Sequence, residues 1–229
     1  MDLFSHRVYI ESQRSKEDKQ VAASLMRGWK TLGIPDFLQF DNELSFRGSN
    51  KYPRSFGIVI KLCLYFGIQP VFIPVGEPWR NGVIERFNDT YNTKFFRREW
   101  FNSYSHLKRR SKEFQRFHNK HHRYSCLRGK TPDEFSKSND DKPMTLGGNT
   151  KIPNLDYIPD GNIILIRFIR SDRMLDIFGE KFQLPKDLVY SYVKAVIVTE
   201  SHTLQVYMDE EFVVSFNYQL PIDFGANNL

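Results

Sequence analysis

Two acidic residues stand where separate chain elements could bring their carboxylates together. Asp41 ends the apolar run 37–40, and Glu85 lies about one turn into residues 84–95, where apolar side chains recur at helical spacing. Carboxylates that converge from separate elements can hold Mg²⁺ or Mn²⁺ for phosphoryl transfer. The helix dipole alone also favours a carboxylate in a first turn, so Glu85 by itself has an ordinary explanation. Together with Asp41 it forms a candidate metal site.

The loop that leads into the Glu85 helix contains Pro78 and Gly82. Asn81 is a plausible N-cap, because its side-chain oxygen can accept a first-turn N–H. Trp79 either stacks on a nucleic-acid base or pins its own loop, and the sequence leaves both open.

The elements that must position these residues alternate between strand and helix. The pattern predicts a strand at 7–11, a helix from a Ser15 cap, a strand at 37–40, a helix from Pro53 to Gly67 and an extended run at 69–75. Such alternation predicts an α/β layer with parallel strands. Ligands of these sheets collect beyond the carboxyl ends of the strands, where Asp41 would stand.

Positive charge is concentrated in the middle of the chain. From Lys94 to Lys130, twelve Lys or Arg residues accompany only two Glu, whereas the net charge of the whole chain is +6. A helix is expected at 105–121 within this stretch. A field this concentrated suggests a polyanionic partner, most simply nucleic acid. A solvated helix face is the alternative that charge alone leaves open.

The hydrophobic pattern changes after residue 135. Thr131 and Glu134 frame a capping box at a helix start, and residues 136–157 have the polar, Gly- and Asn-containing composition of a linker. Short β-like runs then follow at 163–169, 175–178, 181–184, 193–199, 203–208 and 212–220. We predict a core at 1–135 and a small all-β domain, a barrel or tight sandwich, at 158–223.

The composition of the chain limits the classes of protein to which it can belong. The 229 residues are 40% hydrophobic and 26% charged, as in a globular protein. No apolar run approaches the roughly 20 residues that cross a bilayer, and no signal peptide is visible. Cys63 and Cys126 are too few for a disulfide framework, so a cytoplasmic protein without membrane contact is expected. Cys63 is most simply a small core residue.

Several blocks of sequence resemble the integrase-type DDE transposases of bacterial insertion sequences, which share the retroviral-integrase core. Residues 40–46, Phe-Asp-Asn-Glu-Leu-Ser-Phe, are similar to the Asp-Asn-Gly-x-x-Phe segment that carries the family's second acid. Residues 78–88, Pro-Trp-Arg-Asn-Gly-Val-Ile-Glu-Arg-Phe-Asn, resemble its third-acid helix, and 43 residues separate Asp41 from Glu85. Residues 122–134 resemble the stretch that closes the core, and residues 2–6 also follow the pattern, so the resemblance spans 2–135.

This resemblance implies a ribonuclease H-like core that cuts and joins DNA strands. Asp41 and Glu85 would be its second and third metal-binding acids, with Mg²⁺ or Mn²⁺ as cofactor. Residues expected to contact DNA are Trp79, Arg80, Asn81, Arg86, Lys94, Arg97, Arg98, Lys108, Arg109 and Arg110. The family usually works as homo-multimers on mobile-element ends and target DNA, so a nucleoid-associated bacterial or archaeal protein is implied.

The chain departs from the family pattern at two places. Glu43 stands where the family usually has Gly, which puts the turn after Asp41 in question. The family's first acid has no counterpart, since Asp2 matches a non-catalytic Asp. We therefore expect an N-terminally truncated core that lacks its first strand and is inactive alone. Unpaired backbone groups and exposed apolar faces should follow near 7–11. The alternative is a non-catalytic DNA-binding remnant or a regulator of a full-length relative.

Other chemistries have weaker support in the sequence. Three histidines of the basic stretch (His118, His121 and His122) and Cys126 could suggest zinc, but no second Cys pair stands nearby to finish a tetrahedral site, so zinc is not expected. Ser45 and Ser125 lack the partners of a hydrolytic triad.

Overall fold

The computed structural model describes residues 1–47, 52, 54–74, 76–139, 144–148 and 150–221. The chain divides into two compact units. The first comprises Met1–Lys16, Ala23–Ile34 and Asn81–Thr150, and the second comprises Glu17–Ala22, Pro35–Arg80 and Lys151–Leu229. Asp41 therefore belongs to the second unit and Glu85 to the first. None of the helices in the described ranges is long and apolar enough to cross a membrane.

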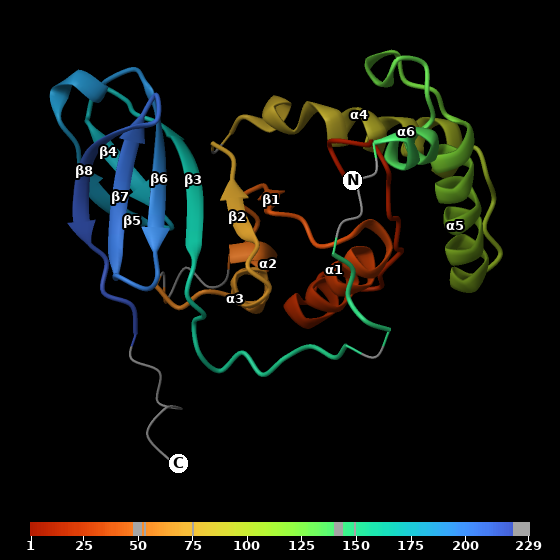
Figure 1. The fold of residues 1–229 in the computed structure, drawn as a ribbon, viewed down its shortest axis with the longest axis horizontal. Helices are drawn as coiled ribbons and strands as arrows, with labels where there is room; N and C mark the ends of the chain where they lie inside the picture. Colours follow the sequence, from red (N-terminus) through yellow and green to blue (C-terminus); the bar gives the residue numbers. More distant parts are fainter. Residues whose placement is uncertain (48–51, 53, 75, 140–143, 149, 222–229) are drawn as a thin grey trace. The chain divides into compact units, whose positions relative to one another are not determined.

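A six-stranded sheet organises the second unit (Figure 1). Its strands, in spatial order, are β1 (Phe37–Phe40), β2 (Gln69–Phe72), β3 (Asn162–Phe168), β6 (Tyr192–Val198), β7 (Thr203–Met208) and β8 (Glu211–Asn217). The first two pairings are parallel and the remaining three are antiparallel. The strands β4 (Met174–Ile177) and β5 (Glu180–Gln183) form a separate hairpin.

The strands of the C-terminal part lie within two or three residues of the predicted runs. Their alternation of apolar and polar side chains specifies one buried face, as on β3, where Ile163 and Leu165 are fully buried. Of the two predicted forms, a barrel or a tight sandwich, the closed barrel is not seen in the described residues. β3 pairs with β2, with Val71 opposite Ile164, so these strands extend the sheet of the core and leave β1 and β8 at its two ends. This pairing satisfies backbone groups that would otherwise be exposed on the edge of β2.

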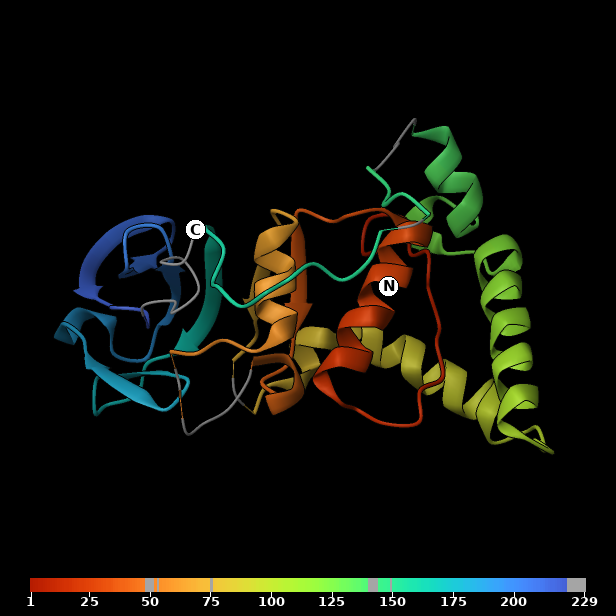
Figure 2. The same ribbon diagram turned by 90° about the horizontal axis from the view of Figure 1, so that it is seen from below.

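One helix of the second unit, α3 (Ile58–Tyr65), packs along β2 (Figure 2). It begins after Gly57, later than the Pro53 start predicted from the sequence, and Pro53 itself lies outside the described residues. Gly67, with a φ of 70°, ends the helix as predicted. A Cβ on Gly161 would lie 2.9 Å from Leu64 Cδ2, so the absence of a side chain there permits close packing of α3 on the start of β3.

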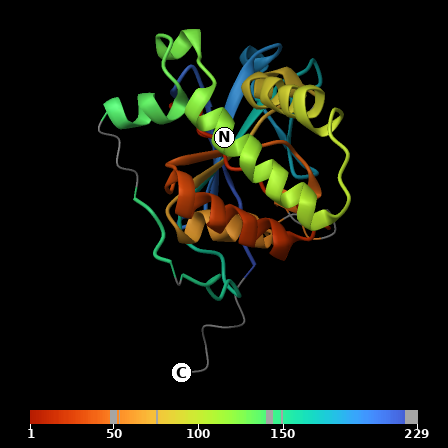
Figure 3. The ribbon, with the colours of Figure 1, turned by 90° about the vertical axis from the view of Figure 1, so that its right-hand side faces the viewer.

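The helices of the first unit follow the sequence signals closely. The long helix α5, whose N-cap Ser103 accepts a hydrogen bond from the N–H of His106, faces the viewer in Figure 3, and Thr131 forms the complete predicted capping box of α6. Within the described residues, the remaining helical segments are α1, which begins three residues after Ser15, a short α2, α4, three 3₁₀ turns and the π-helical turn η2. Bounds are α1 Asp18–Leu32, α2 Leu44–Arg47, η1 Pro78–Asn81, α4 Gly82–Tyr91, η2 Asn92–Phe96, α5 Tyr104–His121, η3 Ser125–Leu127, α6 Pro132–Ser138 and η4 Lys186–Leu188.

Residues 7–11 do not form the predicted strand. Instead, two side chains of α5 pair with their backbone. Asn119 accepts from the N–H of Val8 through Oδ1 at 2.9 Å and donates to its carbonyl at 3.0 Å. Gln115 accepts from the N–H of Ile10 at 2.8 Å. The helix thus supplies the hydrogen bonds of a neighbouring strand, and Val8 is only 1% exposed. The expected unpaired groups and exposed apolar face therefore do not occur at Val8.

Because the side chain of Asn119 supplies hydrogen bonds that a neighbouring strand would otherwise make, Asn119→Ala should lower the stability of the fold strongly. Removing the amide leaves two buried backbone groups of Val8 without partners, so the free energy of unfolding should fall by roughly 2–4 kcal/mol in urea denaturation. Lys120→Ala removes the adjacent exposed side chain and should change the free energy of unfolding by less than about 0.5 kcal/mol. Equal effects of the two substitutions would contradict this role of Asn119.

Candidate metal and nucleic-acid site

Asp41 directly follows β1 and is exposed. Its Oδ1 accepts a hydrogen bond from the N–H of Glu43 at 3.0 Å, which closes a tight turn. The turn continues into α2, where the N–H of Phe46 bonds the carbonyl of Glu43 at 3.0 Å. Glu43 is not among the described non-glycine residues with positive φ. The turn therefore accommodates a Glu where the similar family has Gly.

Asn42, the next residue, is held at both ends of its amide. Its Nδ2 donates to the carbonyl of Ile73 at 2.7 Å, and its Oδ1 accepts from the guanidinium of Arg167 at 2.9 Å. Arg167 was not among the residues predicted from the sequence to belong to the site. The available signal was its position on β3, where strict alternation from Ile163 and Leu165 places an arginine on the buried face.

Glu85 lies in the first turn of α4 and is exposed. Asn81 occupies the N-cap position as predicted, but its side chain makes no cap hydrogen bond, because the chain enters the helix through the 3₁₀ turn η1. Two residues beyond Glu85, Phe87 is buried, with its ring centroid 4.9 Å from His118 and 6.5 Å from Phe114 of α5. These contacts fix how α4 is rotated against α5, and they therefore fix the direction in which Glu85 faces.

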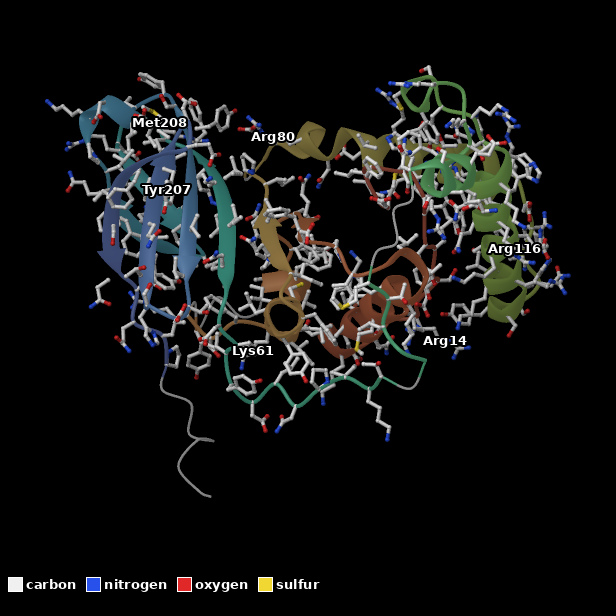
Figure 4. The ribbon with its side chains drawn as sticks, viewed as in Figure 1. Arg14, Lys61, Arg80, Arg116, Tyr207 and Met208 are labelled. Carbon is white, nitrogen blue, oxygen red and sulfur yellow. The ribbon has the colours of Figure 1, made fainter. Side chains whose placement is uncertain are left out.

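Arg80 is held within the second unit. Its Nε donates to Glu77 at 2.6 Å, its guanidinium lies 4.1 Å above the ring of Tyr192, and the Tyr192 hydroxyl donates to the other oxygen of Glu77 at 2.9 Å. The hydrogen bond from Arg80 lowers the pKa of Glu77. Figure 4 labels Arg80 beside the end of β2. A DNA contact by Arg80 would compete with this ion pair, and the side chain of Trp79 lies outside the described residues.

The cations predicted to bind DNA differ in their surroundings. Lys94, Arg97 and Arg98 are exposed around η2, and Arg86 is exposed on α4. On α5, Lys108, Arg109, Arg116 and Lys120 are exposed, and we call these four residues the α5 basic surface. Side chains with nitrogen atoms gather along α5 around the labelled Arg116 in Figure 4.

Two other cations of α5 are engaged within the first unit. Arg110 bonds both carboxylate oxygens of Glu99, at 2.6 and 2.8 Å, and also Glu113, and these hydrogen bonds raise its pKa. Lys112 lies 3.8 Å from the ring centroid of Tyr9, and burial lowers its pKa. The predicted DNA residue Arg110 is therefore less available to a phosphate than the α5 basic surface.

A cluster of aromatic and histidine rings joins α5 to the segment after it. His118 is 3% exposed, stacks on His122 at a centroid distance of 5.2 Å, and its Nε2 lies 3.3 Å from the Tyr124 hydroxyl. Cys126 Sγ lies 4.0 Å from Nε2 of His6. In the part of the chain that the structure describes, no group of three or more His, Cys, Asp or Glu side chains could hold a metal ion. The rings of this cluster pack against one another.

The described residues combine a mixed α/β architecture with an exposed carboxylate in the first turn of α4 and exposed cations on α5. Comparison with known protein families shows which class of protein part of the chain is similar to. Residues 66–132 match the family described as Integrase core domain, and this supports an integrase- or transposase-type catalytic core with a ribonuclease H-like fold. The match contains α4 with Glu85 and all of α5, whereas Asp41 lies before it. No curated protein matches the chain.

Burial of His118 predicts that stability falls with acid. Burial, followed by the nearby His122, lowers the pKa of His118 from its ordinary 6.5 to about 4. The unfolded chain therefore takes up a proton before the folded one does. The free energy of unfolding should be highest above about pH 6.5 and fall as the pH drops toward 4.

Urea denaturation between about pH 7 and pH 5 measures this slope. His118→Gln should make the slope shallower, whereas His121→Gln, which changes an exposed ring on the same helix, should leave it unchanged. The prediction fails if His118→Gln retains the slope of the unsubstituted chain.

Proposed function

We propose that this protein takes part in DNA transposition or integration by metal-dependent phosphodiester strand transfer. The observation that carries the proposal is the Integrase core domain match across residues 66–132, which contains both Glu85 and the α5 basic surface. Asp41 and Glu85 are proposed as the second and third acids of the catalytic centre. Because they belong to different units, their convergence on one site is part of the proposal.

The donor chemistry of the two acids fits a hard divalent ion. Asp41 and Glu85 are both exposed carboxylates, and oxygen ligands of this kind suit Mg²⁺ and Mn²⁺. Asp41 is fixed by its turn and Glu85 by the packing of α4 on α5, so each side chain starts from a defined backbone position. When bound, the ions would activate the attacking oxygen and stabilise the leaving one.

The α5 basic surface is proposed to hold the DNA backbone. Arg109, Arg116 and Lys120 are seven and four residues apart, so they share one face of the helix. Their positive charges would neutralise phosphates and release bound counterions. Exposed Lys94, Arg97 and Arg98 extend the same kind of surface around η2.

Strand transfer in this class needs three acids, and no residue of this sequence matches the first of them. We therefore propose that the 229 residues bind DNA and metal but do not transfer strands unaided. A second candidate is a non-catalytic DNA-binding protein. The α5 basic surface favours it specifically, because binding through this surface requires no metal.

Metal binding separates the two candidates. Asp41→Asn and Glu85→Gln should each weaken Mn²⁺ binding about tenfold or more in calorimetric titration, because each removes a carboxylate ligand. Asp187→Asn, which neutralises an exposed carboxylate elsewhere, should have no effect. Unchanged Mn²⁺ affinity in both site variants would favour the non-catalytic candidate.

Salt dependence tests the proposed DNA surface. The double variant Arg109→Gln, Arg116→Gln should bind duplex DNA more weakly, with a plot of log affinity against log salt that is shallower by about two, since each lost phosphate contact removes about 0.9. The control Lys181→Gln, Lys186→Gln removes two exposed cations of the second unit and should leave the slope unchanged. Equal slopes for the unsubstituted chain and the α5 variant would rule out this surface as the footprint.

A further inference from the structure

Arg167 is an arginine on the buried face of a strand. On β3, Ile163 and Leu165 are fully buried, and Arg167, the next residue of the same parity, is 7% exposed. A guanidinium carries five N–H donors in a rigid plane and is costly to bury unless these donors are satisfied. An arginine at such a position therefore depends on the acceptors that it bonds.

The hydrogen bonds of Arg167 converge on three separate segments. Nη2 donates to the Asn42 side chain at 2.9 Å, Nη1 donates to the carbonyl of Ile73 at 3.1 Å, and Nε donates to the carbonyl of Asp176 at 3.1 Å. Nη1 also bonds the carbonyl of Ile166 at 2.9 Å. One side chain thus joins the turn after β1, the end of β2 and the hairpin strand β4.

The Asn42 amide completes a closed network beside Asp41. Asn42 and Arg167 both donate to the carbonyl of Ile73, and the N–H of Ile73 donates in turn to the carbonyl of Phe40 at 3.2 Å. Asp41 lies between Phe40 and Asn42, so its backbone is anchored on both sides. Its carboxylate is then oriented by the bond from the N–H of Glu43.

We propose that Arg167 is a positioning residue for the Asp41 carboxylate. The C-terminal sheet would then complete the candidate catalytic site, although β3 lies outside the segment that matches the Integrase core domain. The planar guanidinium suits this task because it bonds acceptors on three segments at once, which a lysine ammonium cannot do in the same geometry. The role of Asp41 itself rests on the proposed function.

A purely structural role is the alternative to be tested, and Arg54 provides a matched control. Arg54 also joins the body of the second unit to its C-terminal part. It bonds both oxygens of Glu180, donates to the carbonyl of Gln219 at 3.0 Å and lies 4.6 Å from the ring centroid of Tyr218. None of these contacts involves the Asp41 turn. Arg54→Met should therefore reproduce a general loss of stability.

The experiment compares Arg167→Met and Arg54→Met in the full chain, at a temperature where both are folded by circular dichroism. The first readout is hydrogen exchange at the Glu43 amide, measured by NMR, because this amide bonds the Asp41 carboxylate. The second is the affinity for Mn²⁺. Arg167→Met should speed exchange at Glu43 and weaken Mn²⁺ binding about tenfold, as loss of residues that orient ligands commonly does. Arg54→Met should do neither.

Two results would overturn the proposal: unchanged Glu43 exchange in Arg167→Met, or equal changes in both variants. Failure of the proposed function has a different signature. In that case Asp41→Asn binds Mn²⁺ as well as the unsubstituted chain does, and the exchange at Glu43 still decides whether Arg167 fixes the turn.

Discussion

β3 lies parallel to β2, with Val71 opposite Ile164 and Phe72 opposite Leu165, and this pairing joins two parts of the chain that are distant in sequence. Without it, β1 and β2 would be a pair of four-residue strands, and two-stranded sheets are marginally stable. With it, the pair becomes one end of a six-stranded sheet whose buried face includes Phe72 against Phe178, with ring centroids 5.3 Å apart. The same pairing brings β3 beside the end of β2, where Arg167 bonds both the carbonyl of Ile73, which follows β2, and the side chain of Asn42, which follows Asp41.

The two proposed acids depend on different supports. Asp41 depends on the sheet of the second unit and on the network around Asn42. Glu85 depends on an aromatic contact, because Phe87 fixes α4 against the buried ring of His118 on α5. Each carboxylate is therefore defined locally, within its own unit. The Integrase core domain match includes Glu85. The proposed role of Asp41 rests instead on the similarity of residues 40–46 to the family segment and on the geometry of the turn.

Local patterns predicted most elements, and tertiary pairing decided the rest. The capping box at Thr131 and the alternating strands of the C-terminal part were predictable because their signals lie within a few residues. The extended run at 7–11 was also visible, but nothing local shows that Asn119 and Gln115 would supply its hydrogen bonds in place of a strand. For the same reason the sequence left a barrel and a sandwich both open, since closure depends on which edges pair. At the site, the sequence indicated both acids and the basic helix. It did not reveal the contacts that engage Arg80 and Arg110 or the role open to Arg167, because those contacts come from residues far along the chain.

We propose that Asp41 and Glu85 hold the same metal ions, and localised backbone cleavage can test this shared site. Fe²⁺ bound in place of Mg²⁺, with ascorbate and peroxide, cuts the chain near the site that it occupies. If the two acids share the ions, cuts should fall close to both Asp41 and Glu85, be suppressed together by excess Mg²⁺, and be lost at both positions after either Asp41→Asn or Glu85→Gln. Cleavage near one acid that persists when the other is replaced would contradict it.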